Sequence, residues 1–469
     1  MIKLSFDDTV HFVGIGGIGM SGIAEVMANL GYNIQGSDLS DGQNIERLKK
    51  IGIKIFLGHN KKNISGVKLV VCSSAISNDN PEINLARELN IPILKRAEML
   101  AELIKNKKTI AVGGTHGKTT TTSLVSEILF GAGFDPTIFN GGIINCFGTN
   151  ARLGESDWAI VEADESDGTF LELPVNIAVV TNIDREHLDF YGDFSKLKKS
   201  FIHFINNVPD NGLSVVCNDD KEINNLLSDF NQEKIITYGI TSKSNFMAKN
   251  IYTTNNFTSF DVYEEEKLII RDIKLPMIGH HNVLNALAAI TVSKKLNVDE
   301  KKIKDLLLNF TGVSRRFSKV GVVNDITIFD DYGHHPVEIR AVLDAARDSS
   351  AGKIIAVMQP HRYSRLSSLF NEFSKCFDSA DHIIISNVYS AGEEPDENYN
   401  RDSLIDSIKS EGKENVLSLE NPEELPGIIK DIANKGDWVI CLGAGDITNW
   451  ARELPQGLKV LLDNKGVSL

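Results

Sequence analysis

Long apolar runs are missing from this chain of 469 residues. No stretch approaches the roughly 18 apolar residues that a membrane helix needs. The opening segment, MIKLSFDDTVHFVGIGG, carries acidic side chains where a signal peptide would have a basic start and an apolar middle. These absences predict a soluble, cytoplasmic protein that is not inserted in a membrane.

Cysteine and net positive charge are also scarce. The formal net charge of −14 leaves no broad basic face with which to displace counterions from nucleic acid. The expected partners are therefore small molecules, and the sequence leaves open whether the chain is a monomer or a homodimer. The five cysteines lie singly, without the spacing of a zinc site or a disulfide framework, at Cys72, Cys146, Cys217, Cys376 and Cys441.

The chain is long enough for about three domains of roughly 150 residues each. In its first part, short β-branched runs alternate with helical patterns, which is typical of a parallel α/β unit. A polar stretch at 105–108 predicts a boundary, so that the first domain spans 1–107. The strand candidates of this domain are 10–14, 32–36, 53–56, 68–72 and 91–94.

The central domain is expected to span 108–310 and the third domain 311–469. Apolar runs such as TIAVGG and NIAVVTNI in the centre, and KIIAVMQ and WVICLGAG in the third part, predict buried parallel strands. Between 245 and 276 the residues alternate, which predicts antiparallel strands added to the central core, with helices following at 281–296 and 299–310. The predicted fold class is α/β in three domains: a Rossmann-like unit, a central P-loop ATPase-like unit with the antiparallel addition, and a second Rossmann-like unit.

The strongest motif is TIAVGGTHGKTTTTSLVSEILF at 109–130, which reads as a strand, a glycine-rich turn and a helix. Backbone N–H groups and the helix N-terminus of such a turn surround phosphate oxygens, while a lysine and a hydroxyl serve the phosphates and Mg²⁺. Three residues separate the two outer glycines, where the usual phosphate loop has four. The expected ATP cradle consists of Gly113, Gly114, Thr115, His116, Gly117, Lys118, Thr119 and Thr120.

A second glycine-rich turn, HFVGIGGIGMSG, places Gly14, Gly16 and Gly19 after the first strand, with Asp38 ending the next one. This spacing alone would indicate a dinucleotide-binding oxidoreductase. Beside a separate ATP cradle, a nucleotide-linked substrate is at least as plausible as a nicotinamide.

Two acidic segments follow strands of the central domain. Carboxylates at the carboxyl ends of parallel strands beside a phosphate loop are where metal for phosphoryl transfer is held, so Mg²⁺ is expected, with Mn²⁺ as an alternative. VEADESDGTF contributes Glu162, Asp164, Glu165 and Asp167, and NIDREHLDFYG contributes Asp184, Glu186, His187 and Asp189.

Four further segments carry polar groups suited to a ligand site. Asparagines at a helix start can cap the helix or meet an adenine edge, arginine forks suit phosphates and carboxylates, and histidine can manage the proton of an amine. These residues are His281, Asn282 and Asn285 in MIGHHNVLNALAAI; Arg315 and Arg316 in GVSRRF; Asp330, Asp331, Tyr332, His334 and His335 in FDDYGHHPVEI; and His361, Arg362 and Arg365 in MQPHRYSRL.

Taken together, GIGGIGMSG, GTHGKTTTT, EADES, NID..HLD, HHNVLNALAA, GVSRRF, DDYGHHP and QPHRYSR resemble the Mur ligase family of bacterial cell-wall synthesis, in its branch of UDP-N-acetylmuramate:L-alanine ligases. The resemblance spans 14–365 and extends to about 448. It implies three domains that bind the UDP-sugar, ATP and the amino acid. The implied reaction joins L-alanine to the lactoyl carboxylate of UDP-N-acetylmuramate through an acyl phosphate, with release of ADP and phosphate.

The resemblance also implies residue roles. Lys118, Glu162, His187 and His334 would be catalytic, with Thr119, Glu162 and His187 holding metal. Asn282, Asn285, Arg316 and Asp331 would join the ATP cradle, and Tyr332, His334, His361, Arg362 and Arg365 would bind L-alanine. The UDP-sugar would meet Gly16, Gly17, Ile18, Gly19, Met20, Ser21, Asp38, Ser74, Arg96 and His116.

Two departures from the family pattern matter. Glu186 stands before His187 where the common version has aspartate, which puts a direct role for that carboxylate in question. Sister ligases use a carbamylated lysine about 15 residues after this histidine, but Phe201 and Ile202 occupy that region here. No carbamylated lysine is therefore expected, in agreement with the alanine-adding branch.

Three other functions remain as alternatives. A murein peptide-recycling ligase would attach a preformed peptide to the same sugar nucleotide. An NAD-dependent oxidoreductase would use the first glycine turn and leave 109–130 without a role. A non-catalytic nucleotide-binding regulator should have lost Lys118, Glu162 or His187, and all three are present.

Overall fold

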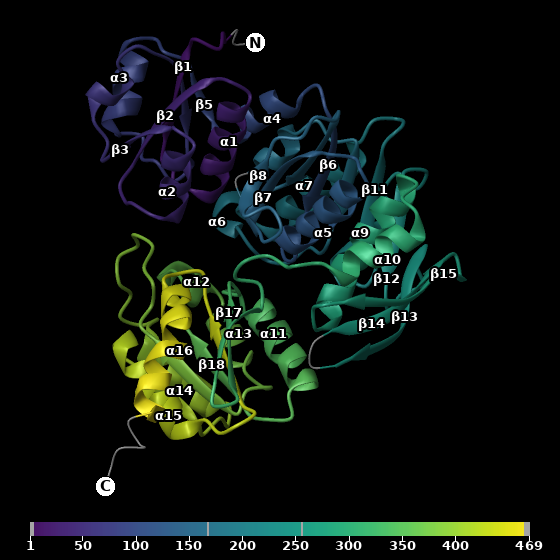
Figure 1. The fold of residues 1–469 in the computed structure, drawn as a ribbon, viewed down its shortest axis with the longest axis vertical. Coiled ribbons are helices and arrows are strands. Elements are labelled where there is room, and N and C mark those ends of the chain that lie inside the picture. The colour runs from purple at the N-terminus through teal and green to yellow at the C-terminus, as the bar shows by residue number, and fades with distance from the viewer. Residues whose placement is uncertain (1–3, 167, 255–256, 464–469) are drawn as a thin grey trace. The chain divides into compact units, whose positions relative to one another are not determined.

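The computed structural model describes residues 4–166, 168–254 and 257–463 (Figure 1). By contacts between Cα atoms they form two compact units. Unit 1 comprises Met1–Asn250, Phe260–Lys274 and Leu284–Thr311, and unit 2 comprises Ile251–Ser259, Leu275–Val283 and Gly312–Leu469. Among the described helices, none combines the length and the hydropathy that crossing a bilayer requires.

The N-terminal sheet is fully parallel, in the order β3-β2-β1-β4-β5. The alternation of strand and helix in the sequence predicts this arrangement, and all five expected strands are present. Because the strands are parallel, the turns that follow them meet at one edge of the sheet, where ligands of such sheets bind. Its elements are β1 (Thr9–Val13), α1 (Ile18–Asn29), β2 (Asn33–Asp38), α2 (Gln43–Lys50), β3 (Lys54–Leu57), β4 (Val67–Cys72), α3 (Pro81–Glu88), β5 (Ile93–Lys95) and α4 (Arg96–Ile104).

The central sheet has ten strands in the order β15-β14-β13-β12-β11-β10-β6-β9-β7-β8. Its parallel part contains β6 (Lys108–Gly113), β9 (Trp158–Glu162), β10 (Ile177–Val180), β11 (Leu213–Cys217) and β12 (Ile235–Gly239). The hairpin β7 (Thr137–Ile144) and β8 (Thr149–Arg152) forms one end. The helices are α5 (Lys118–Gly131), α6 (Leu188–Tyr191), α7 (Phe194–Asn206), α8 (Lys221–Leu226), α9 (His280–Lys295) and α10 (Glu300–Leu308).

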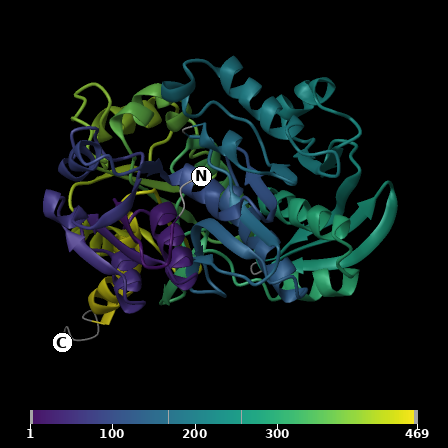
Figure 2. The same ribbon diagram turned by 90° about the horizontal axis from the view of Figure 1, so that it is seen from above.

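The expected addition forms the other end of this sheet as β13 (Phe246–Thr253), β14 (Thr258–Glu264) and β15 (Lys267–Leu275), drawn in teal in Figure 2. Its first strand, β13, pairs parallel with β12, so the prediction of antiparallel strands is wrong where the addition joins the core. Glu265 and Glu266, with φ of 47° and 69°, form the two-residue turn between β14 and β15. So short a connection between neighbouring strands makes them antiparallel.

The C-terminal sheet has the order β16-β17-β21-β18-β19-β20, with only β16 and β17 antiparallel among its described pairs. Successive residues of β18 point to opposite faces, so Ile354 and Ala356 join one core cluster and Ile355 and Val357 the other. Helices cover both faces, which explains the continuous apolar run KIIAVMQ. The elements are β16 (Ser318–Val323), β17 (Ile326–Asp331), α11 (Pro336–Ser349), β18 (Ile354–Met358), α12 (Tyr363–Ser368), α13 (Phe370–Ser374), β19 (His382–Ser386), α14 (Arg401–Ser410), β20 (Val416–Leu419), α15 (Leu425–Ile432), β21 (Trp438–Leu442) and α16 (Ile447–Asp463).

Candidate active site

The glycine-rich turn between β6 and α5 has the conformation that the motif predicts. Gly114 and Gly117 have φ of 121° and 81°, which side-chain-bearing residues rarely adopt. A Cβ atom at Gly114 would lie 2.2 Å from Oγ1 of Thr181, and one at Gly117 would lie 2.6 Å from Oδ1 of Asn285. Both positions therefore require glycine, and the turn brings backbone N–H groups to the start of a 14-residue helix.

Lys118 begins α5 and is held by the turn itself. Its Nζ donates to the carbonyl oxygens of Gly114 and Thr115 at 2.7 and 3.0 Å, and lies 2.9 Å from Glu165 Oε2. Burial disfavours the ammonium ion, but the nearby carboxylates, Glu165 first, raise the pKa of Lys118 above its ordinary value. The lysine is thus a fixed positive charge beside the turn.

Thr119 and Glu162 form the first carboxylate group of the site. The Thr119 hydroxyl donates to Glu162 Oε1 at 3.0 Å, and the Gly141 N–H donates to Glu162 Oε2 at 2.6 Å. Strand pairing places Glu162 opposite Val112 at the end of β6, which is why the carboxylate reaches the first turn of α5. A hydroxyl and a carboxylate oxygen are donors that Mg²⁺ accepts.

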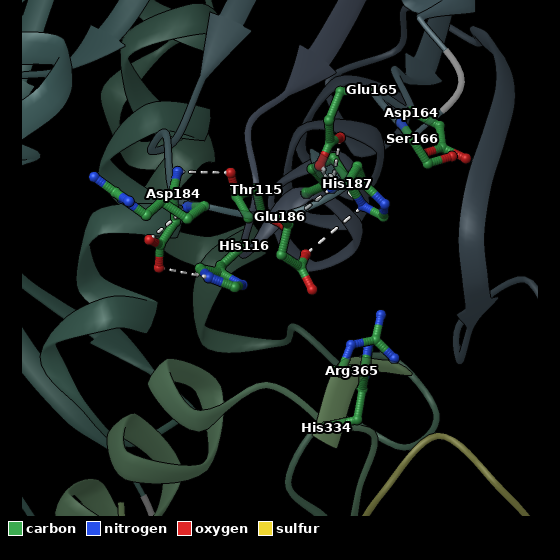
Figure 3. A network of polar contacts seen from close by, with 12 residues as sticks. Thr115, His116, Asp164, Glu165, Ser166, Asp184, Glu186, His187, His334 and Arg365 are labelled. Atoms are coloured by element: carbon green, nitrogen blue, oxygen red, sulfur yellow. Dashed lines mark hydrogen bonds and ion pairs between the residues drawn. The ribbon is translucent and has the colours of Figure 1, made fainter. Parts of the chain in front are cut away.

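Glu165, Glu186 and His187 form a second group (Figure 3). Nε2 of His187 lies 3.7 Å from Glu165 Oε1 and 3.7 Å from Glu186 Oε2. Burial raises the pKa of Glu165 to about 7, against the effect of Lys118. One imidazole nitrogen and two carboxylate oxygens within 4.8 Å of one another make a donor set that could hold a divalent cation.

The predicted metal set of Thr119, Glu162 and His187 is therefore divided between two groups: the first two residues contact each other, whereas His187 lies with Glu165 and Glu186. Asp167, which the sequence grouped with them, lies outside the described residues, and so does the side chain of Asp189. Asp164 forms an ion pair with Arg96 at 3.3 Å, a link between the central sheet and α4 that the sequence does not reveal.

The end of β10 supports the glycine turn from the other side. Thr181 Oγ1 and Asn182 Nδ2 both donate to the carbonyl oxygen of His116, at 2.6 and 2.9 Å. Nε2 of His116 lies 3.4 Å from Asp184 Oδ2. The backbone N–H of Asp184 donates to Thr115 Oγ1 (Figure 3). Sequence analysis missed Thr181 and Asn182, although their place directly after a strand next to the cradle was the available signal.

The two asparagines at the start of α9 differ. Asn285 Oδ1 accepts a hydrogen bond from Thr121 at 3.1 Å and packs against Gly117, so it lies at the cradle. Asn282 donates to the carbonyl oxygen of Ile278 at 2.8 Å, which is a local bond at its own helix start. His281 is buried, and burial lowers its pKa to about 4.

The first-domain turn also has the expected shape, with Gly14 at φ 78° and α1 starting at Ile18. Its backbone N–H at Gly16 donates to Asp38 Oδ2 at 2.8 Å, so Asp38 fixes the turn itself. Among the other expected sugar-nucleotide residues, Met20 and Ser21 are buried, and the Ser21 N–H donates to the Gly17 carbonyl oxygen within the helix, whereas Ser74 is exposed. A Cβ at Gly19 would lie 3.0 Å from Arg96 Cδ, so this arginine borders the turn.

In unit 2, Asp331 is a buried carboxylate at the end of β17. Its oxygens accept from the N–H groups of Phe317 and Gly333, both at 2.7 Å, and burial raises its pKa. Arg316 stacks on the Tyr332 ring with its guanidinium carbon 5.2 Å from the ring centroid. Asp331 therefore holds together the two loops that carry Arg316 and Tyr332.

The remaining expected residues of unit 2 lie in a row. The His334 ring centroid is 5.2 Å from that of Tyr332 and 5.9 Å from that of His361. Arg365 NH1 lies 3.3 Å from His361 Nδ1, and burial, with His334 and the neighbouring arginines, lowers the pKa of His361 to about 4. Arg362 has a φ of 68°, a strained conformation for a residue with a side chain.

Known proteins resemble this chain along most of its length. The chain matches the family models "Mur ligase family, catalytic domain" over 9–108, "Mur ligase middle domain" over 112–293 and "Mur ligase, glutamate ligase domain" over 315–445. It is similar to the UDP-N-acetylmuramate--L-alanine ligase of Parvibaculum lavamentivorans, with 52% identity over 457 residues that cover 96% of this chain and 93% of that protein. The enzyme of the same name from Rhodospirillum centenum is 51% identical over 458 residues, covering 97% and 95%.

A solved structure gives the same result. The UDP-N-acetylmuramate-alanine ligase of Thermotoga maritima superposes with a TM-score of 0.83 at 31% identity, covering 98% of this chain and 99% of that one. The three-domain α/β fold class and the resemblance inferred from the motifs are confirmed. The chain belongs to the Mur ligase family.

Proposed function

We propose that the chain is an ATP-dependent ligase that joins L-alanine to the lactoyl carboxylate of UDP-N-acetylmuramate in peptidoglycan precursor synthesis. The observation that carries the proposal is the phosphate loop with Lys118 fixed beside Glu165, in a chain 52% identical to a relative named for this reaction. Family membership leaves the oxidoreductase alternative without support.

The chemistry needs a carboxylate activated before an amine can attack it. A carboxylate oxygen of the sugar attacks the γ-phosphorus of ATP, the bond to the β-phosphate oxygen breaks, and ADP leaves. The neutral amine of L-alanine then attacks the acyl carbon, loses one proton, and displaces phosphate. Each step develops negative charge on phosphate oxygens, which a preorganised cationic site stabilises.

The ATP site of this proposal is the cradle at 113–120 with Asn282, Asn285, Arg316 and Asp331. The N–H groups of the turn would bind phosphate oxygens, and Lys118 would neutralise charge on the β- and γ-phosphates. Asn285 supports the turn at Gly117, whereas Asp331 would act by holding Arg316 and Tyr332 rather than by direct contact.

The described residues also fit Mg²⁺, or Mn²⁺ in its place. Thr119 and Glu162 supply oxygen donors, and Glu165, Glu186 and His187 supply a second set. When bound, a divalent cation neutralises phosphate charge and polarises the bonds that react. Glu186 is one methylene longer than aspartate, and its place 3.7 Å from His187 makes it a candidate ligand.

For the amino acid, the proposal assigns Tyr332, His334, His361, Arg362 and Arg365. Arginine forks suit a carboxylate, and a neutral imidazole can accept a proton from an amine. His361 has a pKa of about 4 and is neutral near pH 7, which suits a group that must not repel an ammonium ion. His334, whose Nδ1 lies 3.0 Å from the Tyr332 carbonyl oxygen, is the candidate acceptor for that proton.

For the sugar nucleotide, the proposal assigns Gly16 to Ser21 to the pyrophosphate, through backbone N–H groups of the first turn of α1. Asp38, Ser74, Arg96 and His116 complete the proposed sugar-nucleotide site, with Asp38 shaping the turn.

The proposed domain boundaries are 1–107, 108–310 and 311–469. The proposal also includes a cytoplasmic location, small-molecule substrates only, and a monomer or homodimer.

The test is a phosphate-release assay in which each component is left out in turn. We expect release only when UDP-N-acetylmuramate, L-alanine, ATP and Mg²⁺ are all present. Release with a preformed peptide but not with L-alanine would overturn the proposal in favour of the peptide-recycling ligase. No phosphate release with either L-alanine or the preformed peptide would favour the non-catalytic regulator.

A further inference from the structure

The carboxyl edge of the C-terminal sheet carries one aromatic side chain that the sequence did not single out. Tyr389 follows β19, and its side chain is 40% exposed. The strands β17, β18, β19 and β21 are parallel, so their following loops meet at this edge. Tyr389 is therefore on the same edge as His334 and His361, which follow β17 and β18.

Tyr389 is held firmly for an exposed residue. Its ring stacks on the His361 ring, with centroids 5.4 Å apart and planes inclined by 14°. On another side the Tyr389 ring packs against Gly445. A Cβ atom added to Gly445 would lie 2.8 Å from Tyr389 Cγ. Glycine at 445 thus makes room for the ring, and exposure here does not mean freedom to move.

The backbone around Tyr389 is tied to the strained residue Arg362. The Arg362 N–H donates to the Tyr389 carbonyl oxygen, and the Tyr389 N–H donates to the Pro360 carbonyl oxygen, both at 2.8 Å. Glu393 in the same loop accepts from the Ser364 N–H and hydroxyl at 2.9 and 2.5 Å. The loop at 389–393 and the segment at 360–364 therefore form one rigid frame.

This frame combines the groups that recognise a small amino acid. Arg362 and Arg365 suit the carboxylate and the histidines suit the amine, but a methyl side chain needs an apolar surface. One face of the Tyr389 ring is covered by His361, and the exposed part of the ring offers an apolar surface beside that histidine.

We propose that Tyr389 is a specificity-determining residue: its ring, held between His361 and Gly445, forms the wall that limits the side chain of the incoming amino acid to about the size of a methyl group. The inference rests on the proposed function, and it assigns a role to a residue outside the expected alanine set. Because the ring acts through its volume, its hydroxyl should matter little.

The experiment compares kcat/KM for glycine, L-alanine, L-2-aminobutyrate and L-valine in the wild type, Tyr389→Ala and Tyr389→Phe. Since one methylene in an apolar pocket changes discrimination by roughly 10-fold or more, Tyr389→Ala should raise the ratio of L-2-aminobutyrate to L-alanine by at least about 10-fold. Tyr389→Phe should keep the wild-type ratio. The KM for ATP and for UDP-N-acetylmuramate should stay unchanged in both variants.

Tyr389→Trp is the second test, because it adds volume and does not depend on tolerance of a cavity. It should shift the preference from L-alanine towards glycine. Tyr252→Ala, at an exposed tyrosine on β13, is the matched control and should leave all ratios unchanged.

Unchanged amino-acid ratios in both Tyr389→Ala and Tyr389→Trp, with a wild type active on L-alanine, would overturn the inference and leave the proposed function intact. A wild type that is inactive with every amino acid would instead overturn the proposed function.

Discussion

Two glutamates of unit 1 are almost equally buried and yet differ in protonation. Glu82, in the first turn of α3, is 0% exposed, and Glu165, after β9, is 1% exposed. The pKa of Glu82 lies at about 2, below its ordinary value, whereas that of Glu165 lies at about 7, above it. Burial raises both values, so the difference comes from the neighbours.

Glu82 is surrounded by donors. Oε2 accepts from Ser37 Oγ at 2.5 Å and lies 3.3 Å from ring nitrogens of both His11 and His59. Oε1 accepts from the Asn60 N–H at 3.1 Å and from Asn63 Nδ2 at 2.6 Å. The carboxylate stays charged because its oxygens are satisfied, so it serves the fold of the first domain.

The charged neighbours of Glu165 are instead one cation, Lys118, and a second carboxylate, Asp164. Lys118 lowers its pKa, but Asp164 raises it together with burial. A carboxylate whose charge is incompletely compensated beside a phosphate loop is typical of a functional site. The comparison therefore predicts that Glu82 stabilises the fold and that Glu165 serves chemistry, and the following experiments test this prediction.

The largest effect is expected for Lys118→Ala. Removing the charge that faces the phosphates should lower kcat/KM for ATP by about 1,000-fold, as loss of one preorganised donor does. The free energy of unfolding should also fall, because the buried carboxylate of Glu165 loses its cation, while the glycine turn stays held by Thr181 and Asn182. Lys196→Ala, at an exposed lysine, is the control. Full activity of Lys118→Ala in the phosphate-release assay would refute the proposed ATP site.

Glu82→Ala should have its effect on stability. Removing the buried acceptor strands His11, Ser37 and Asn63 and should reduce the free energy of unfolding by about 3–5 kcal/mol. Glu88→Ala is the matched control on the same helix, since Glu88 is exposed and lies 3.7 Å from Lys61; it should cost no more than about 0.5 kcal/mol. Urea titration of both variants gives the measurement. Equal stabilities would show that the network contributes nothing.

The pH dependence of stability follows from the same carboxylate. Because its folded-state pKa, about 2, is below the ordinary 4.5, the contribution of Glu82 is present above pH 4.5 and is lost as the pH falls towards 2. Its full size is about 3 kcal/mol, from about 1.4 kcal/mol per pKa unit. The free energy of unfolding should thus fall less between pH 5 and pH 3 in Glu82→Gln than in the wild type. Parallel curves would contradict the pKa assigned to Glu82.

The smallest effect is expected for Glu165→Gln, which keeps the shape and removes the charge. Loss of the carboxylate that faces Lys118 and belongs to the second candidate donor set with His187 should lower kcat/KM for ATP by about 10- to 100-fold. Stability should stay within about 1 kcal/mol of the wild type. Glu155→Gln, at an exposed position, serves as control. A large loss of stability without loss of activity would place Glu165 with Glu82 as a structural residue.

Local pattern was enough for much of the fold and part of the site. The strands of the first domain, the hairpin of β14 and β15 and the turn at Gly114 and Gly117 follow from residue types and spacing alone, whereas the parallel pairing of β13 with β12 does not. The same local reading could not tell that Met20 and Ser21 turn their side chains into the core, because a loop motif does not specify where its helix packs. Local pattern also could not predict that Thr181 and Asn182 support the glycine turn, because their contact with the turn depends on β10 lying beside β6.

The amino-acid sequence by itself determined the phosphate loop, the order of the domains and the family, since these depend on residues close together along the chain. Only the tertiary structure decided which carboxylate faces Lys118. The register of β9 on β6 places Glu162 beside Thr119, and the chain then turns so that Glu165, three residues later, reaches the lysine. The same holds for Tyr389, since its place between His361 and Gly445 arises from loops that meet only at the edge of a folded parallel sheet.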